Sequence, residues 1–191
     1  MRVYWFVDGI IRMLFRGKKM VDITYKGAII GCEDGAYATN RVIEMDRILG
    51  STQGYDLIFV AGGVKEFMDS DQEEIKVFCT SIDVTVQLHK AHEFHIVAHN
   101  NCGAYGGTDH FNHDLLREKR HHHKVLHDAA QKLIRRYGPE TCVHMYYEQL
   151  SEAGEYSIMT MGHWVDLRKE SKAEPHLLLI GNGVWDLEVQ Y

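Results

Sequence analysis

The chain has 191 residues, of which 45% are hydrophobic and 25% are charged, and its formal net charge is −6. This length and composition are those of a single globular domain that can bury a full core without disulfide bonds. The excess of acidic residues disfavours a nucleic acid or an anionic membrane surface as the main partner.

Residues 1–25 precede the first predicted strand and are expected to form an N-terminal arm. Met1 to Phe15 are apolar and aromatic, but Asp8, Gly9 and Arg12 interrupt the run. The run is also shorter than the roughly 20 apolar residues that span a bilayer, and no signal-peptide cleavage pattern follows it. We expect this arm to pack on a partner subunit, with a first core strand or helix as the alternative.

Hydrophobic periodicity and turn residues predict a core over residues 26–161 and a C-terminal extension over 162–191, within one domain of residues 1–191. A capping signal at Ser70-Asp71-Gln72-Glu73 begins one of the helices, and Thr108 and Asp109 begin another. The predicted elements are, in order, strand 26–31, helix 36–49, strand 55–61, helix 70–91, strand 94–98, helix 108–137, strand 141–147 and, after a turn at 152–155, an antiparallel strand over 156–161.

This alternation predicts an α/β fold of three layers, with a mainly parallel central sheet and an antiparallel edge strand. In such sheets, ligands bind outside the carboxyl ends of the strands, where the strand order reverses. Two predicted strands end in polar, Gly-rich turns, Cys32-Glu33-Asp34-Gly35 and His99-Asn100-Asn101-Cys102-Gly103. We therefore expect the functional site to lie between these two turns.

Cys32, His99 and Cys102 are candidate ligands of a zinc ion, which favours thiolate and imidazole donors in a tetrahedral array. Asp34 is a candidate for the fourth position, or for a hydrogen-bond acceptor beside it. The alternative is that both cysteines are small buried apolar residues and that His99 is an ordinary strand-end histidine. Because all three stand at predicted strand ends, the metal site is favoured, and with it free thiols in a reducing, cytoplasmic compartment.

These motifs resemble those of the β-class carbonic anhydrases, which carry Cys-x-Asp-x-Arg after the first strand and His-x-x-Cys-Gly after the third. The resemblance covers roughly residues 26–161. It implies a homodimer or higher homo-oligomer, zinc held by Cys32, His99 and Cys102, and hydration of carbon dioxide to bicarbonate by zinc-hydroxide attack. It further implies that Asp34 either coordinates zinc in a closed state or accepts a hydrogen bond in an open one.

Other functions remain open at this point. The same fold and ligands serve hydrolysis of carbonyl sulfide or carbon disulfide in relatives of that family. A non-catalytic member would hold a closed, structural or regulatory zinc site. A nucleotide-binding α/β domain without metal is a third possibility, although Gly62-Gly63 and Gly106-Gly107 do not fit a phosphate-binding motif and predict close backbone approach instead.

The chain departs from the family at Ala36, where the motif has its arginine. A guanidinium pairs with the neighbouring aspartate through a rigid fork of donors, which an alanine cannot replace. Arg41 is not expected to reach Asp34. We therefore expect Asp34 to be freer to ligate zinc, which would give a closed site of low activity.

Histidines are abundant, with thirteen in the chain. The run His121-His122-His123 is expected to lie on a solvated helix face, with a second metal site or a proton-shuttling patch as alternatives. His110 and His113 follow the proposed metal loop and are expected to line the mouth of the cleft.

Overall fold

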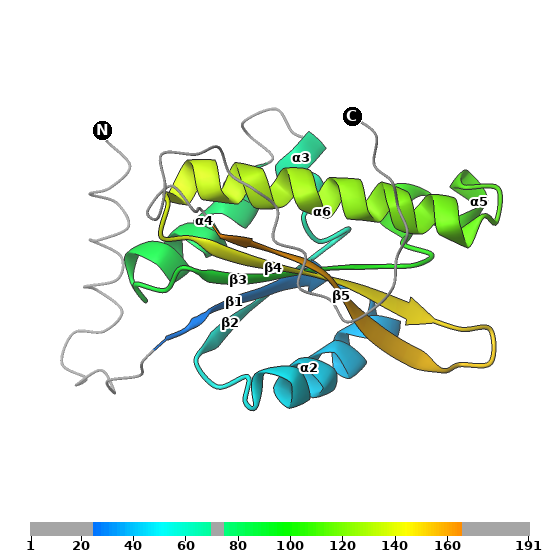
Figure 1. The fold of residues 1–191 in the computed structure, drawn as a ribbon, viewed down its shortest axis with the longest axis horizontal. Coiled ribbons are helices and arrows are strands. Elements are labelled where there is room, and N and C mark those ends of the chain that lie inside the picture. The colour runs from blue at the N-terminus through cyan, green and yellow to red at the C-terminus, as the bar shows by residue number, and fades with distance from the viewer. Residues whose placement is uncertain (1–24, 70–74, 166–191) are drawn as a thin grey trace.

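A computed structural model describes residues 25–69 and 75–165 (Figure 1). The predicted N-terminal arm, the capping signal at residues 70–73 and most of the predicted C-terminal extension lie outside the described residues. Among the helices that are described, none combines the length and apolar character that a membrane span requires.

A five-stranded sheet forms the middle layer, with strand order β2-β1-β3-β4-β5. Strands β1 to β4 run parallel and β5 runs antiparallel to β4, which confirms the predicted mainly parallel sheet with an antiparallel edge. The strands are β1 (Gly27–Cys32), β2 (Tyr55–Val60), β3 (Glu93–His99), β4 (Cys142–Leu150) and β5 (Tyr156–Val165).

Helices cover both faces of the sheet and complete the three layers (Figure 1). One face is covered by α2 (Gly35–Leu49), and the other by α3 (Lys65–Asp69), α4 (Ile75–Gln87) and α6 (Leu115–Tyr137). A short 3-10 helix, η1 (Gly103–Tyr105), and one turn of helix, α5 (Gly107–His110), follow β3.

The alternation of side chains along each strand divides the core in two. Ile30 faces the larger cluster, which is packed under α4 and α6, whereas its neighbour Ile29 faces Met45 of α2. Because every residue of β1 is buried, its sequence reads as a continuous run of apolar and small residues rather than as an alternating pattern.

The prediction of one helix over residues 108–137 is wrong, because the chain breaks between α5 and α6. Asn112 and His113 both take left-handed backbone conformations, with φ of 56° and 58°, which ends the first helix. Asp114 then caps the second, its Oδ1 accepting hydrogen bonds from the main-chain N–H groups of Leu116 and Arg117. The predicted helix over 70–91 likewise ends early, at Gln87.

Leu133 of α6 is fully buried, whereas Leu116 of the same helix is 50% exposed. Leu133→Ala should lower the free energy of unfolding by about 2–5 kcal/mol, because it removes buried methyl groups and leaves a cavity. Leu116→Ala is the matched control and should change it by no more than about 0.5 kcal/mol. Urea denaturation of both variants measures the difference, and equal losses would contradict the packing of α6 described here.

Candidate metal centre

The strand order reverses at β1, which pairs in parallel with β2 on one side and with β3 on the other. Cys32 is the last residue of β1 and His99 is the last residue of β3. Both ligand candidates therefore stand at the carboxyl ends of adjacent strands, where open α/β sheets bind their ligands.

The structure brings Cys32, His99 and Cys102 together, with their ligand atoms all within 4.8 Å of one another. Their exposed fractions are only 7%, 1% and 2%. The two Sγ atoms lie 3.9 Å apart, close to the roughly 3.8 Å that two thiolates span on a tetrahedral zinc ion with bonds of about 2.3 Å. The donor set and its spacing fit zinc.

The imidazole of His99 is oriented as a metal ligand. Its Nδ1 lies 2.8 Å from the carbonyl oxygen of Asn100, which can only accept, so Nδ1 carries the proton. The hydroxyl of Tyr37 donates to Oδ1 of Asn100 at 2.8 Å, and the Tyr37 ring lies 4.0 Å from the His99 ring. Nε2 is buried without a hydrogen-bond partner, and a bound metal would satisfy this otherwise costly lone pair.

The thiol of Cys32 is set up to ionise. Its hydrogen bond with the Cys102 thiol lowers the pKa of Cys32 well below its usual range, and the N–H of Gly62 supports the thiolate by donating to Sγ at 3.2 Å. The same hydrogen bond and burial raise the pKa of Cys102. Gly62 reaches Cys32 with a φ of 71°, and a Cβ on it would lie 2.8 Å from Cβ of Ala104. This confirms the expected close backbone approach at Gly62-Gly63.

A buried ion pair supports the end of β1. The fully buried guanidinium of Arg41 donates to both carboxylate oxygens of Glu148, at 2.9 and 2.6 Å, and to the carbonyl oxygen of Cys32 at 2.6 Å. The carbonyl oxygen of Glu148 in turn accepts the N–H of Asn100 at 3.0 Å. Glu148 therefore links the two strand ends that carry candidate ligands. Its side chain binds Arg41 at the end of β1, and its main chain binds Asn100 at the end of β3.

The sequence pattern does not single out Glu148, and it gives Arg41 no role at the site. Arg41 was expected not to reach Asp34, and the structure directs its guanidinium to Cys32 and Glu148 instead. Two signals were available in the sequence. Arg41 stands between Tyr37 and Met45 on the buried stripe of α2, and Gly31 has no side chain to block it, since a Cβ there would lie 2.5 Å from the guanidinium.

Asp34 lies two residues after Cys32 and is half-buried. It is the N-cap of α2, and its Oδ1 accepts a hydrogen bond from the N–H of Ala36 at 3.0 Å. The three-residue ligand group does not include it. Its role as a fourth ligand or as a hydrogen-bond acceptor stays a prediction.

Helix α6 places two further polar side chains beneath the turn that joins His99 to Cys102. Glu118 accepts the N–H of Asn101 at 2.6 Å through Oε1, and its Oε2 has no hydrogen-bond partner. Burial raises the pKa of Glu118. The expectation of a solvated face is wrong for His122, which is 1% exposed, and burial lowers its pKa to about 3, so its imidazole is neutral.

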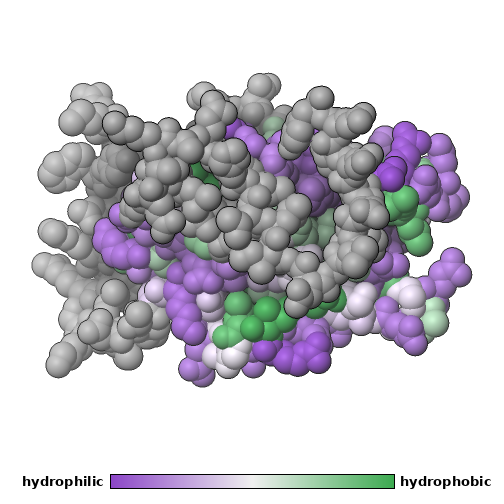
Figure 2. Space-filling model, viewed as in Figure 1, coloured by the Kyte–Doolittle hydropathy of each residue, from purple (hydrophilic) through white to green (hydrophobic). Residues whose placement is uncertain are grey.

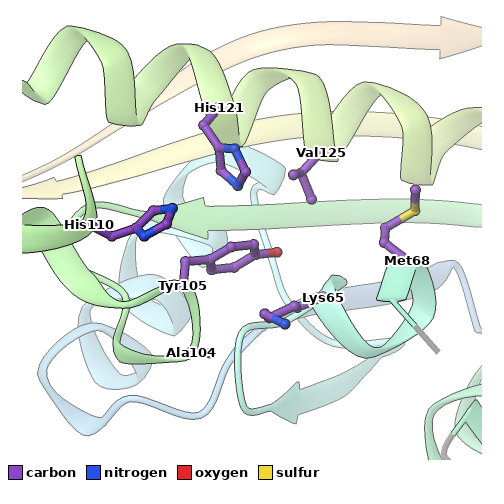
Figure 3. A pocket seen from close by; sticks show the side chains of 7 residues that line it. All are labelled: Lys65, Met68, Ala104, Tyr105, His110, His121 and Val125. Atoms are coloured by element: carbon purple, nitrogen blue, oxygen red, sulfur yellow. The ribbon is translucent and has the colours of Figure 1, made fainter.

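A cavity of about 290 Å³ lies beside the turn that follows Cys102. Figure 3 shows Tyr105 among the side chains that line it, between the imidazoles of His110 and His121 and the side chain of Lys65. His110 lines this cavity, whose lining includes none of the candidate zinc ligands, whereas His113 is not among the lining residues and its side chain is 77% exposed. The lining residues are Lys65, Met68, Ala104, Tyr105, His110, His121 and Val125.

Residues 23–156 match a protein family described as "Putative carbonic anhydrase". The chain is also similar to several solved structures. A carbonic anhydrase from Glaciozyma antarctica is 15% identical over 84% of this chain and 96% of its own, with a TM-score of 0.47. A tetrameric β-carbonic anhydrase from Sordaria macrospora is 14% identical over 82% and 92%, with a TM-score of 0.47. A carbon disulfide hydrolase is 13% identical over 94% and 100%, with a TM-score of 0.42. Comparison with curated proteins gave no match.

The buried pair Arg41–Glu148 is expected to stabilise the fold far more than an exposed pair on the same helix. Arg41→Met should lower the free energy of unfolding by about 3–5 kcal/mol, because it leaves the Glu148 carboxylate buried without a partner. Arg47, whose side chain is 77% exposed, pairs with Glu44, and Arg47→Met should cost at most about 1 kcal/mol. Urea denaturation at neutral pH compares the two. A loss below about 1 kcal/mol for Arg41→Met would contradict the supporting role of the pair.

Proposed function

The chain belongs to the family of putative carbonic anhydrases, and we propose that it is a zinc enzyme that hydrates carbon dioxide to bicarbonate. One observation carries the proposal: two buried thiols and an imidazole with an unpartnered Nε2 converge at the ends of β1 and β3. A set of three protein ligands leaves one tetrahedral position for water or substrate, which is the arrangement of catalytic rather than structural zinc.

Zinc held by Cys32, His99 and Cys102 would supply a Lewis acid that lowers the pKa of water, towards about 7 in the best-known sites. The residues of this chain prepare that site. The carbonyl of Asn100 holds the His99 ring, and the N–H of Gly62 stabilises negative charge on Cys32. Because two thiolates donate more charge than imidazoles do, we expect the rate to rise between about pH 7 and 9.

Asp34 is proposed as the carboxylate that accepts a hydrogen bond from the attacking water. It follows Cys32 by two residues, and its Oδ1 already accepts a main-chain N–H at the start of α2. This cap occupies Oδ1 of Asp34 at the helix terminus, and it therefore opposes the closed state that the loss of the arginine at position 36 led us to expect. Arg41 does not take the place of that arginine, since its guanidinium binds Glu148 and the Cys32 carbonyl instead.

We further propose that the protein is a homodimer or larger homo-oligomer in the cytoplasm. Large apolar side chains are exposed on α2 and β2, with Ile43 at 59%, Ile48 at 45% and Leu57 at 49%. Figure 2 shows hydrophobic surface at the lower centre of the visible face, where Figure 1 places α2. The four cysteines are free thiols, which suits a reducing compartment.

The ligand assignment predicts that Cys32→Ser and His99→Ala each remove about one zinc equivalent per chain and abolish carbon dioxide hydration. Loss of a ligand should weaken zinc binding by more than the roughly 10–100-fold that loss of a ligand's hydrogen-bond partner costs. Elemental analysis and stopped-flow hydration assays on the same samples measure both effects. Cys79→Ala is the control, because Cys79 is a buried thiol on α4 that faces the core, and it should keep zinc and activity. Full zinc content in Cys32→Ser would refute the assignment. If the wild type holds zinc without hydrating carbon dioxide, carbonyl sulfide and carbon disulfide are the next substrates to assay.

The role of Asp34 predicts that Asp34→Asn keeps its zinc but hydrates carbon dioxide about 100-fold more slowly, as expected for loss of a proton-accepting group. Glu33→Gln, at the exposed neighbouring carboxylate, should leave the rate unchanged. Stopped-flow assays from pH 7 to 9 compare the two. A faster Asp34→Asn protein would show instead that the carboxylate occupies the fourth zinc position in a closed site.

A further inference from the structure

A second group of metal-ligating side chains lies at the opposite edge of the sheet, at the amino ends of β3 and β4. The parallel register pairs Glu93 with Cys142 and His95 with His144. Since residues two apart on a strand share a face of the sheet, these four side chains lie next to one another on one face. The register between β3 and β4 brings these four residues together, and no local sequence motif marks them.

Ligand atoms of Glu93, His95 and His144 all lie within 4.8 Å of one another, and Cys142 approaches this group at His144. Oε1 of Glu93 lies 2.9 Å from Nε2 of His95 and 3.5 Å from Nε2 of His144, and Sγ of Cys142 lies 3.4 Å from Nε2 of His144. Tetrahedral zinc holds nitrogen, oxygen and sulfur ligands about 3.3–3.8 Å apart, given bonds of about 2.0–2.3 Å. The distances from Nε2 of His144 to Glu93 and to Cys142 already match these values. The distance between Glu93 and His95 needs to increase by a few tenths of an ångström.

A hydrogen bond at Nδ1 holds the imidazole of His95 in an orientation that suits metal binding through Nε2. Nδ1 lies 3.1 Å from the hydroxyl of Tyr146, which directs Nε2 into this group. His95 is 1% exposed, and burial lowers its pKa, which favours the neutral form that binds metals. A partner on the second ring nitrogen is the usual support of a metal-binding histidine.

We propose that Glu93, His95, His144 and Cys142 form a second zinc site that ties β3 to β4. Four protein ligands fill a tetrahedral ion, so the role of this site is structural. The His95 and His144 rings are now stacked, with centroids 4.6 Å apart and planes 5° apart. Binding therefore requires one ring to rotate until both Nε2 lone pairs point to the ion. The side chains of Glu93 and His144 are 36% and 26% exposed, which leaves room for that rotation.

A hydrogen-bonded network without metal is the competing account. In that account Glu93 stays ionised between two histidines: its hydrogen bonds with His144 and His95 hold the pKa of Glu93 well below its usual range. Burial lowers the pKa of His144, but hydrogen bonds with Cys142 and Glu93 outweigh it and raise the pKa to about 9. The thiol of Cys142 favours the zinc site over this network. A carboxylate–histidine pair needs no sulfur, whereas zinc prefers a set of sulfur and nitrogen ligands.

Zinc counting on the full-length protein tests the site independently of the first one. After dialysis against a mild chelator, the wild type should hold about two zinc equivalents per chain, and Cys32→Ser and His144→Gln about one each. His144→Gln should keep the hydration activity of the wild type. His89→Gln is the matched control, because His89 is also a part-buried histidine paired with a carboxylate, that of Asp56, and it should keep both equivalents. A wild type with about one equivalent and a Cys32→Ser protein with none would overturn the proposal.

Cobalt substitution keeps the test decisive if His144→Gln fails to fold. Co²⁺ bound to a thiolate has charge-transfer absorption in the near ultraviolet, and Cys32→Ser protein loaded with Co²⁺ should show it. Adding Cys142→Ala to that background should abolish the band, whereas adding Cys79→Ala should leave it. An unchanged band in the Cys142→Ala protein would exclude Cys142 as a ligand and overturn the four-residue site.

Discussion

The site at the carboxyl edge of the sheet depends on one buried charge pair. Glu148 accepts two hydrogen bonds from Arg41 and one, at 2.7 Å, from the hydroxyl of Tyr156, while its main-chain carbonyl accepts the N–H of Asn100. Arg41 also donates through Nη1 to the carbonyl oxygen of Cys32. One ion pair thus joins α2, β1, β4 and β5 and fixes the turn after β3. Burying it carries a desolvation cost that well-packed apolar residues would avoid, which fits a role in positioning ligands rather than in stability alone.

This pair also changes how the missing arginine of the metal motif is understood. Ala36 leaves the first turn of α2 without a guanidinium, yet a guanidinium does reach the same strand end from one turn further along the helix. It binds the main chain of Cys32 rather than the side chain of Asp34. The carboxylate is held by the helix N-terminus instead, where main-chain N–H groups and the helix dipole favour negative charge. Arg41 thus supports the end of β1, whereas the start of α2 holds the carboxylate of Asp34.

The break between α5 and α6 has a similar effect on the second ligand turn. By stopping at Asn112 and His113 and starting again at Asp114, the chain places Glu118 one turn into α6, under the N–H of Asn101. Asn101 has a left-handed φ of 54°, and its Oδ1 accepts the N–H of Thr108. The turn between His99 and Cys102 is therefore held by hydrogen bonds to both α5 and α6.

The sequence by itself determined the features that depend on neighbouring residues or on strand order. The apolar runs predicted the strands, and the turns after them predicted the candidate ligands Cys32, His99 and Cys102, since parallel strands bring their carboxyl ends to one edge. Only the tertiary structure decided which distant residues meet. Arg41 and Glu148 are 107 positions apart, His122 is buried although its neighbours suggested a solvated face, and Glu93 meets His144 through the register of β3 on β4. Which distant side chains meet follows from the packing of the whole chain, and no local motif marks these pairs.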